Sequence, residues 1–169
     1  MLLHPEKWTP GTPERALADF LFAWSKGDLA AMFKSTCYSW QKSMRIKPAF
    51  QYLQDWFLWA KPKSATLLST ETTRSISGPE DIYAVYPIDA EAPDSEYSEM
   101  QRELAAEYIE KMKAPAGPFI AIIKAKIAYK ANNRKHESVI DITVIRETKG
   151  LGVDPGGEWG VLATVAIPN

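Results

Sequence analysis

The sequence TPERALADFLFAWSKGDLAAMFKSTCYSW, residues 12–40, carries the clearest structural signal in this chain. Thr12 is a residue type that caps helices through its side-chain oxygen, and Pro13 suits the first helical position, where no N–H is needed. Gly27 can adopt the left-handed conformation that ends a helix, and Asp28 can cap the next helix. The stretch therefore predicts two helices joined by a tight corner at residues 26–28.

Both predicted helices have one apolar face. In the first helix, apolar residues recur at the spacing i, i+3, i+4, i+7, which places them on one side. These residues are Leu17, Phe20, Leu21 and Trp24. In the second helix, a single stripe continues to the end of the stretch and contains Leu29, Met32, Phe33, Thr36, Cys37 and Trp40. Because the corner is so short, we expect the two helices to pack at a sharp angle and share one core.

Length and composition indicate one globular domain. The chain has 169 residues, of which 46% are hydrophobic and 24% are charged, and a chain of this length can bury roughly 70% of its unfolded surface. We expect residues 1–11 to form an N-terminal arm and residues 12–169 to form the domain. The net charge of −1 argues against binding to nucleic acid or to an acidic membrane through bulk electrostatics. We therefore expect neither a nucleic-acid nor a membrane partner.

Three features favour a cytoplasmic protein. Cys37 is the single cysteine, which excludes an internal disulfide framework and fits a reducing compartment. The sequence has no apolar run of about 18 residues, the length that a membrane-spanning helix needs. The first residues, MLLHPEKWTP, lack the basic and apolar regions of a secretory signal.

After Trp40 the chain changes from helical to strand periodicity. A third helix is expected from Pro48 until Pro62 ends it, with a stripe formed by Ala49, Leu53, Trp56, Phe57 and Ala60. Alternating apolar and polar residues predict five strands, over residues 66–76, 82–92, 119–131, 137–148 and 158–167. Strong helix formers predict an extra helix over residues 95–113. We expect the last three strands to form an antiparallel meander with one apolar and one wetter face.

This order of elements, with the Gly27-Asp28 corner and a late Gly-Glu-Trp-Gly-Val strand at residues 157–161, resembles the NTF2-like superfamily (nuclear transport factor 2, ketosteroid isomerase, scytalone dehydratase and SnoaL-like proteins). The resemblance implies an α+β fold whose N-terminal helices pack in the concave face of a curved antiparallel sheet, leaving a conical pocket. The helix at 95–113 is then an insertion. The resemblance also implies a homodimer formed through the outer face of the sheet. It leaves activity open, because the superfamily contains enzymes and non-enzymes.

The resemblance transfers no catalytic residue to this chain. When the sequences are aligned on the corner, the helix tyrosine of steroid isomerases falls on Phe20, and their general-base aspartate falls near Met44, where there is no carboxylate. Related dehydratases need a paired His and Asp in the pocket. Here His4 lies in the arm and His136 lies in a polar turn.

Asp141 is the acid with the most suggestive position for catalysis, in the middle of a predicted strand. A desolvated strand carboxylate can act as an acid or a base. The apolar residues of this strand alternate with Asp141, however, and therefore point to the opposite face of the sheet. We thus favour a cross-strand pairing of Asp141 with Lys124 or Lys126. Asp89 and Glu91 lie on the less apolar face of their predicted strand, so we likewise interpret them as structural and not as catalytic residues.

Three other features are interpreted as structural. His136 lies in a polar hairpin turn and is more typical of a solvated loop than of an anion site. Cys37 lies on an apolar stripe, which predicts a small buried core residue. Residues 154–157, Asp-Pro-Gly-Gly, predict a turn. No CxxC, HExxH or GxGxxG motif occurs, so we expect no metal and no cofactor.

Aromatic residues are the best indication of a ligand site. Seven of them could line the mouth and walls of the cone: Phe20, Trp24, Phe33, Trp40, Tyr52, Trp56 and Tyr86. Pockets for small apolar ligands are lined in this way, although the same rings can instead fill the cone as core, and we favour the filled core. The sequence thus predicts a non-catalytic module that holds a small apolar molecule or a protein partner. The alternative is a lyase or isomerase that acts in the cone.

Overall fold

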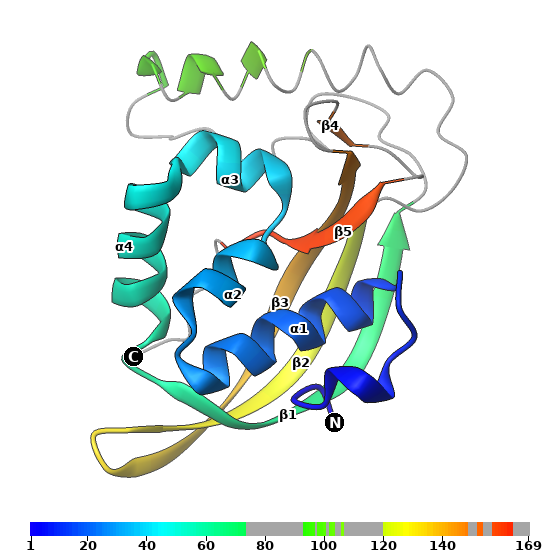
Figure 1. Ribbon diagram of the computed structural model, residues 1–169, viewed down its shortest axis with the longest axis vertical. Coiled ribbons are helices and arrows are strands. Elements are labelled where there is room, and N and C mark those ends of the chain that lie inside the picture. The colour runs from blue at the N-terminus through cyan, green and yellow to red at the C-terminus, as the bar shows by residue number, and fades with distance from the viewer. Residues whose placement is uncertain are drawn as a thin grey trace.

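The computed structural model describes residues 1–73, 93–96, 98–100, 102–103, 106, 120–148, 152–153 and 157–163. Within these residues the protein is α+β, with four N-terminal α-helices followed by an antiparallel sheet (Figure 1). Figure 1 shows α1 and α2 in front of the sheet and α4 beside it. The predicted α+β class is therefore confirmed.

The predicted first corner is also confirmed. Helix α1 spans Pro13–Lys26, and the Thr12 hydroxyl accepts a hydrogen bond from Arg15 N at 3.3 Å. Gly27 ends the helix in the left-handed conformation, with φ 71°. Asp28 then caps α2, Leu29–Lys34, by accepting a hydrogen bond from Ala31 N at 3.0 Å.

The predicted continuous helix from Leu29 to Trp40 is wrong. Helix α2 stops at Lys34, and a separate helix α3 spans Tyr38–Met44. Between them the backbone pairs with the edge of the sheet. Val161 N donates to Ser35 O at 2.9 Å, and Cys37 N donates to Val161 O at 2.9 Å. These bonds replace the helical hydrogen bonds that would have joined α2 to α3.

Helix α4 spans Ile46–Phe57 and so begins two residues before Pro48. Pro62 does not end this helix but lies inside strand β1, Lys61–Thr73. In the described part of the sheet, β1 is an edge strand that pairs only with β2. An edge strand tolerates proline because one side of its backbone needs no ladder hydrogen bonds.

The predicted antiparallel meander is confirmed for the described residues. Strands β2, Ile120–Ala131, and β3, Arg134–Thr148, form a hairpin through Asn132 and Asn133, whose φ angles are 50° and 63°. Strands β4, Gly152–Val153, and β5, Glu158–Val161, both pair antiparallel with β3. The predicted strand at 82–92 lies outside the described residues. Of the predicted helix at 95–113, residues 95, 96, 98–100, 102–103 and 106 are described, and all of them except residue 95 are helical.

The core lies between the helices and one face of the sheet. Alternate residues of β2 point into it and are fully buried: Ala121, Ile123, Ala125 and Ile127. The N-terminal arm also contributes, since the Leu2 side chain is fully buried and Leu2 N donates to Ala65 O at 2.8 Å. The arm contains a short 3-10 helix, η1, Pro5–Lys7.

Candidate functional site

Phe20 and Trp24, two of the seven aromatic residues, pack in the protein interior beside α1. The ring centroids of Phe20 and Trp24 lie 5.5 Å and 5.0 Å from that of Phe57, and both contacts are edge-to-face. Trp24 Nε1 donates to Phe57 O at 2.8 Å. The cavity beside these rings measures about 10 Å³, which is at the lower limit for a single water molecule. The interior beside α1 is therefore filled.

Four further aromatic residues form a chain of ring contacts along α2, α3 and α4. The centroid distances are 6.4 Å for Phe33–Trp40, 5.8 Å for Trp40–Tyr52 and 6.0 Å for Tyr52–Trp56. This row of rings begins at Phe33, passes through the buried Trp40 and ends at Trp56, whose exposed fraction is 52%. Tyr86 lies outside the described residues. The six described rings thus contact one another, directly or through Phe57, in tilted or edge-to-face pairs.

Asp141 lies on the outer face of the sheet, where its side chain is exposed. It stands opposite Lys124 in the β2–β3 register, while Lys126 pairs with Glu137 at 2.8 Å. His136 is exposed beside the hairpin turn, and its ring stacks on Tyr129 with a centroid distance of 5.4 Å. Asp89, Glu91 and residues 154–156 lie outside the described residues.

An open groove of about 440 Å³ lies between α1, α2 and β5. It was not expected from the sequence. Three alanines, two aromatic residues and several polar residues line it: Ala16, Asp19, Phe22, Ala23, Lys26, Asp28, Ala31, Lys34, Ser35 and Trp159. The only large apolar residue that α1 contributes to the groove is Phe22, which is 42% exposed and lies off the core stripe. Phe22 was the one signal in the sequence for a second apolar surface on this helix.

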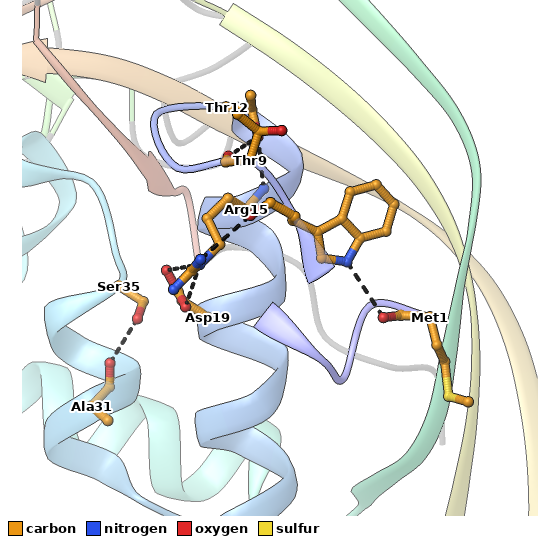
Figure 2. Close-up of polar contacts among 8 residues, drawn as sticks. Met1, Thr9, Thr12, Arg15, Asp19, Ala31 and Ser35 are labelled. Atoms are coloured by element: carbon orange, nitrogen blue, oxygen red, sulfur yellow. Dashed lines mark hydrogen bonds and ion pairs between the residues drawn. The ribbon is translucent and has the colours of Figure 1, made fainter. Parts of the chain in front are cut away.

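Polar side chains on the two sides of the groove are held within their own helices. Arg15 Nε donates to the Asp19 carboxylate at 3.1 Å and 3.3 Å, and the Ser35 hydroxyl donates to Ala31 O at 2.9 Å. Figure 2 shows the Arg15–Asp19 pair on α1 and the Ser35–Ala31 pair on α2. Because these hydrogen bonds are already made, the groove can offer its apolar surface without leaving these groups unsatisfied.

Cations lie over both aromatic residues of the groove. Lys26 Nζ lies 5.3 Å from the centroid of the Phe22 ring, and the Arg146 guanidinium lies 5.9 Å from that of Trp159. Arg146 Nε also donates to Gly157 O at 2.7 Å. These contacts orient the rings, and the cation–π attraction is worth about 0.5–1 kcal/mol at an exposed site.

Sequence reasoning also missed a buried carboxylate, Glu147 of β3, which is only 1% exposed. Its oxygens accept hydrogen bonds from Ser39 N at 2.9 Å and Ser39 Oγ at 2.7 Å. Glu147 thus supplies the N-terminal cap of α3 that the Cys37 side chain does not supply. Residues an even number of positions apart in a strand point to the same face of the sheet, so Glu147 should share the wetter face with the exposed Asp141. Strand periodicity alone therefore predicts an exposed Glu147.

The interpretation of Cys37 as a buried core residue is confirmed. Burial raises the pKa of the Cys37 thiol well above its ordinary value, and the nearby charge of Glu147 raises it further. Since the thiolate is the reactive form, this thiol is unsuited to nucleophilic chemistry at neutral pH. On the neighbouring residue, the Tyr38 hydroxyl donates to Glu158, and this hydrogen bond raises the pKa of Tyr38.

The chain matches no protein-family model, no curated protein and no solved structure. Any functional assignment therefore rests on the residues themselves. Within the described parts of the chain, no group of three or more His, Cys, Asp or Glu residues could hold a metal ion. No helix in those parts is long and apolar enough to cross a membrane.

Proposed function

We propose that this chain is a non-catalytic, NTF2-like protein-assembly module and that the groove between α1 and α2 receives a short segment of a protein partner. The observation that carries this proposal is the difference in volume between the core cavity and the surface groove. The interior beside Phe20 and Trp24 holds about 10 Å³, whereas the groove on the surface holds about 440 Å³. A ligand has room outside the aromatic core and very little room within this part of it.

The lining of the groove suits a polypeptide segment better than a small apolar molecule. The alanines of α1 and α2 allow a partner backbone to approach closely, while Phe22 and Trp159 offer contacts to apolar side chains. The rim carries both charge signs, on Asp19 and Asp28 and on Lys26 and Lys34. Polypeptides carry both signs and apolar groups together. A small apolar ligand would instead need a site that buries most of its surface.

A homodimer, if it forms, should use a surface other than this groove, because two concave surfaces placed face to face would leave a void. The outer face of the sheet is the surface implied by the NTF2-like resemblance. Ile122 and Val139 are exposed there, which supports such an interface, although Lys124 of β2 lies between them and Lys126 of β2 is directly opposite Val139. We propose the cytoplasm as the compartment, in keeping with the single, buried cysteine.

The groove can be tested by filling it. Ala31→Trp places a large ring in the groove, and Ala30→Trp adds the same ring at the exposed neighbouring position on α2. Peptides would be selected from a random library against the wild-type protein, and their affinity for both variants would be measured. We expect Ala31→Trp to weaken binding by about tenfold or more, as blocking a central contact does, and Ala30→Trp to leave binding unchanged.

Three results would overturn the proposal. The first is that the selected peptides bind both variants as tightly as they bind the wild type. The second is that selection yields no binder. The third comes from native mass spectrometry of the purified protein. A co-purified small molecule that persists in Ala31→Trp would place the ligand elsewhere and favour a small-molecule module or the lyase or isomerase alternative.

A further inference from the structure

One stretch of helices in this chain has basic residues and no acidic residue to offset them. Residues 29–54 contain four basic residues and no acidic residue, although the whole chain has 20 Lys and Arg and 21 Asp and Glu. The four are Lys34, Lys42, Arg45 and Lys47. The net charge of −1 therefore hides a segment with a net charge of +4. Since charges interact over only about 10 Å at moderate salt, the local charge governs docking more than the total does.

Three of these cations surround the corner between α3 and α4. Lys42, Arg45 and Lys47 are all exposed, and none of their side chains has an ion pair with another described residue. Ile46 lies between two of them and is 64% exposed, the highest value for any large apolar side chain that the structure describes. Phe50, one turn further along α4, is half-buried. The corner therefore combines an exposed aliphatic side chain with unpaired positive charge.

Helix stability explains only some of these residues. Lys42 lies in the last turn of α3 and Arg45 is the C-cap of that helix, positions where a cation is favourable. Arg45 is at the same time the N-cap of α4, and Lys47 lies in the first turn of α4, where the helix dipole disfavours a cation. Arg45 also adopts φ 62° and ψ 161°, a conformation that glycine tolerates far better than arginine. The chain thus keeps an arginine where the backbone conformation favours glycine, and a lysine at position 47 where the dipole of α4 disfavours one.

We propose that the α3–α4 corner docks on an anionic membrane surface. Ile46 enters the interfacial region, and Lys42, Arg45 and Lys47 contact the lipid phosphates and carboxylates, as basic-apolar surface segments do. Figure 1 places this corner at the periphery of the helices, away from the sheet. A single projecting aliphatic side chain among cations suits a flat, deformable surface. An acidic protein partner would need a pocket of its own for Ile46.

Vesicle binding tests this proposal independently of the α1–α2 groove. The full chain would be mixed with phosphatidylcholine vesicles, with and without phosphatidylserine, and bound protein would be measured by flotation. We expect binding only to vesicles that contain phosphatidylserine, and we expect added salt to weaken it. Each cation near the surface contributes about fivefold to partitioning, so Lys42→Gln/Lys47→Gln should bind about 25-fold more weakly. Ile46→Ser should also bind more weakly.

The matched control removes the same charge elsewhere. Lys124→Gln/Lys130→Gln alters two exposed lysines on the outer face of the sheet and should leave vesicle binding unchanged. Circular dichroism would verify that every variant is folded. Ala31→Trp should retain vesicle binding, so failure of the groove proposal and failure of this one are distinguishable.

Three outcomes would overturn the membrane proposal. Equal binding to neutral and anionic vesicles would remove the role of charge. An equal loss in the corner variant and the sheet variant would show that only total charge matters. Binding to soluble poly-L-glutamate without binding to phosphatidylserine vesicles would assign the corner to an acidic polypeptide instead.

Discussion

Replacing Gly160 of β5 with alanine should destabilise the protein strongly. A Cβ atom at this position would lie 2.5 Å from Cys37 Cα, 2.6 Å from Cys37 N and 2.8 Å from Thr36 C. All three are backbone atoms, so no flexible side chain can move aside. The segment between α2 and α3 must shift away from β5 to make room for the new methyl group.

The magnitude follows from what that shift breaks. Overpacking a tight site costs about 1–3 kcal/mol. The segment is also held by two backbone hydrogen bonds, Val161 N to Ser35 O and Cys37 N to Val161 O, both at 2.9 Å. Each such bond contributes about 0.5–1.5 kcal/mol net. Since the shift weakens these bonds without removing all of them, we expect Gly160→Ala to lower the free energy of unfolding by about 2–4 kcal/mol.

Urea denaturation followed by tryptophan fluorescence would measure this change. Gly11→Ala is the matched control, because a Cβ at Gly11 meets nothing within 4 Å and the only cost is its φ of 79°. That backbone cost is about 1–2 kcal/mol. In a thermal scan, Gly160→Ala should lower the midpoint by roughly 5–15 °C for a chain of this size.

The reasoning would be refuted if Gly160→Ala lost less stability than Gly11→Ala. Such a result would mean that the chain between α2 and α3 does not lie against β5 as the structure places it. The position of Ser39, and with it the cap that Glu147 provides to α3, would then also need revision.

Other substitutions test the core and the buried polar contacts. Ser39→Ala removes the 2.7 Å hydroxyl donor to the buried Glu147 carboxylate and should cost about 1.5–3 kcal/mol in urea denaturation. Phe57→Ala removes the ring that packs edge-to-face on two core aromatics and should cost about 3–5 kcal/mol, whereas Trp56→Ala, at a 52% exposed side chain, should cost less. The raised pKa of Cys37 predicts a loss of stability at alkaline pH, because above about pH 8.5 the unfolded chain ionises this thiol while the folded chain keeps it protonated. Cys37→Ala should therefore show a shallower decline of unfolding free energy with pH than the wild type; equal slopes would contradict the assignment.

Several elements were predictable because their signals are local. The start and end of α1 depend on Thr12 and Gly27, which act within one turn of the helix. The hairpin between β2 and β3 depends on two asparagines that adopt positive φ, and the buried face of β2 follows from strict alternation. Neighbouring residues along the chain are sufficient for these predictions.

The break between α2 and α3 was not predictable in this way. The apolar stripe continues from Leu29 to Trp40 as if the helix were unbroken. The interruption comes from pairing with Val161, a residue far along the chain. Periodicity reports which side of a segment is apolar, but it does not report which distant backbone competes for its hydrogen bonds.

The sequence by itself determined where α1 begins and ends, which faces of β2 and β3 are apolar, and that the stretch from Leu29 to Gln54 has basic but no acidic side chains. The tertiary structure alone decided that Glu147 is buried against Ser39, 108 residues away, and that α1, α2 and Trp159 enclose a groove. The physical reason is that caps and alternation act between neighbouring residues, whereas burial of a carboxylate and the shape of a groove depend on which distant segments meet.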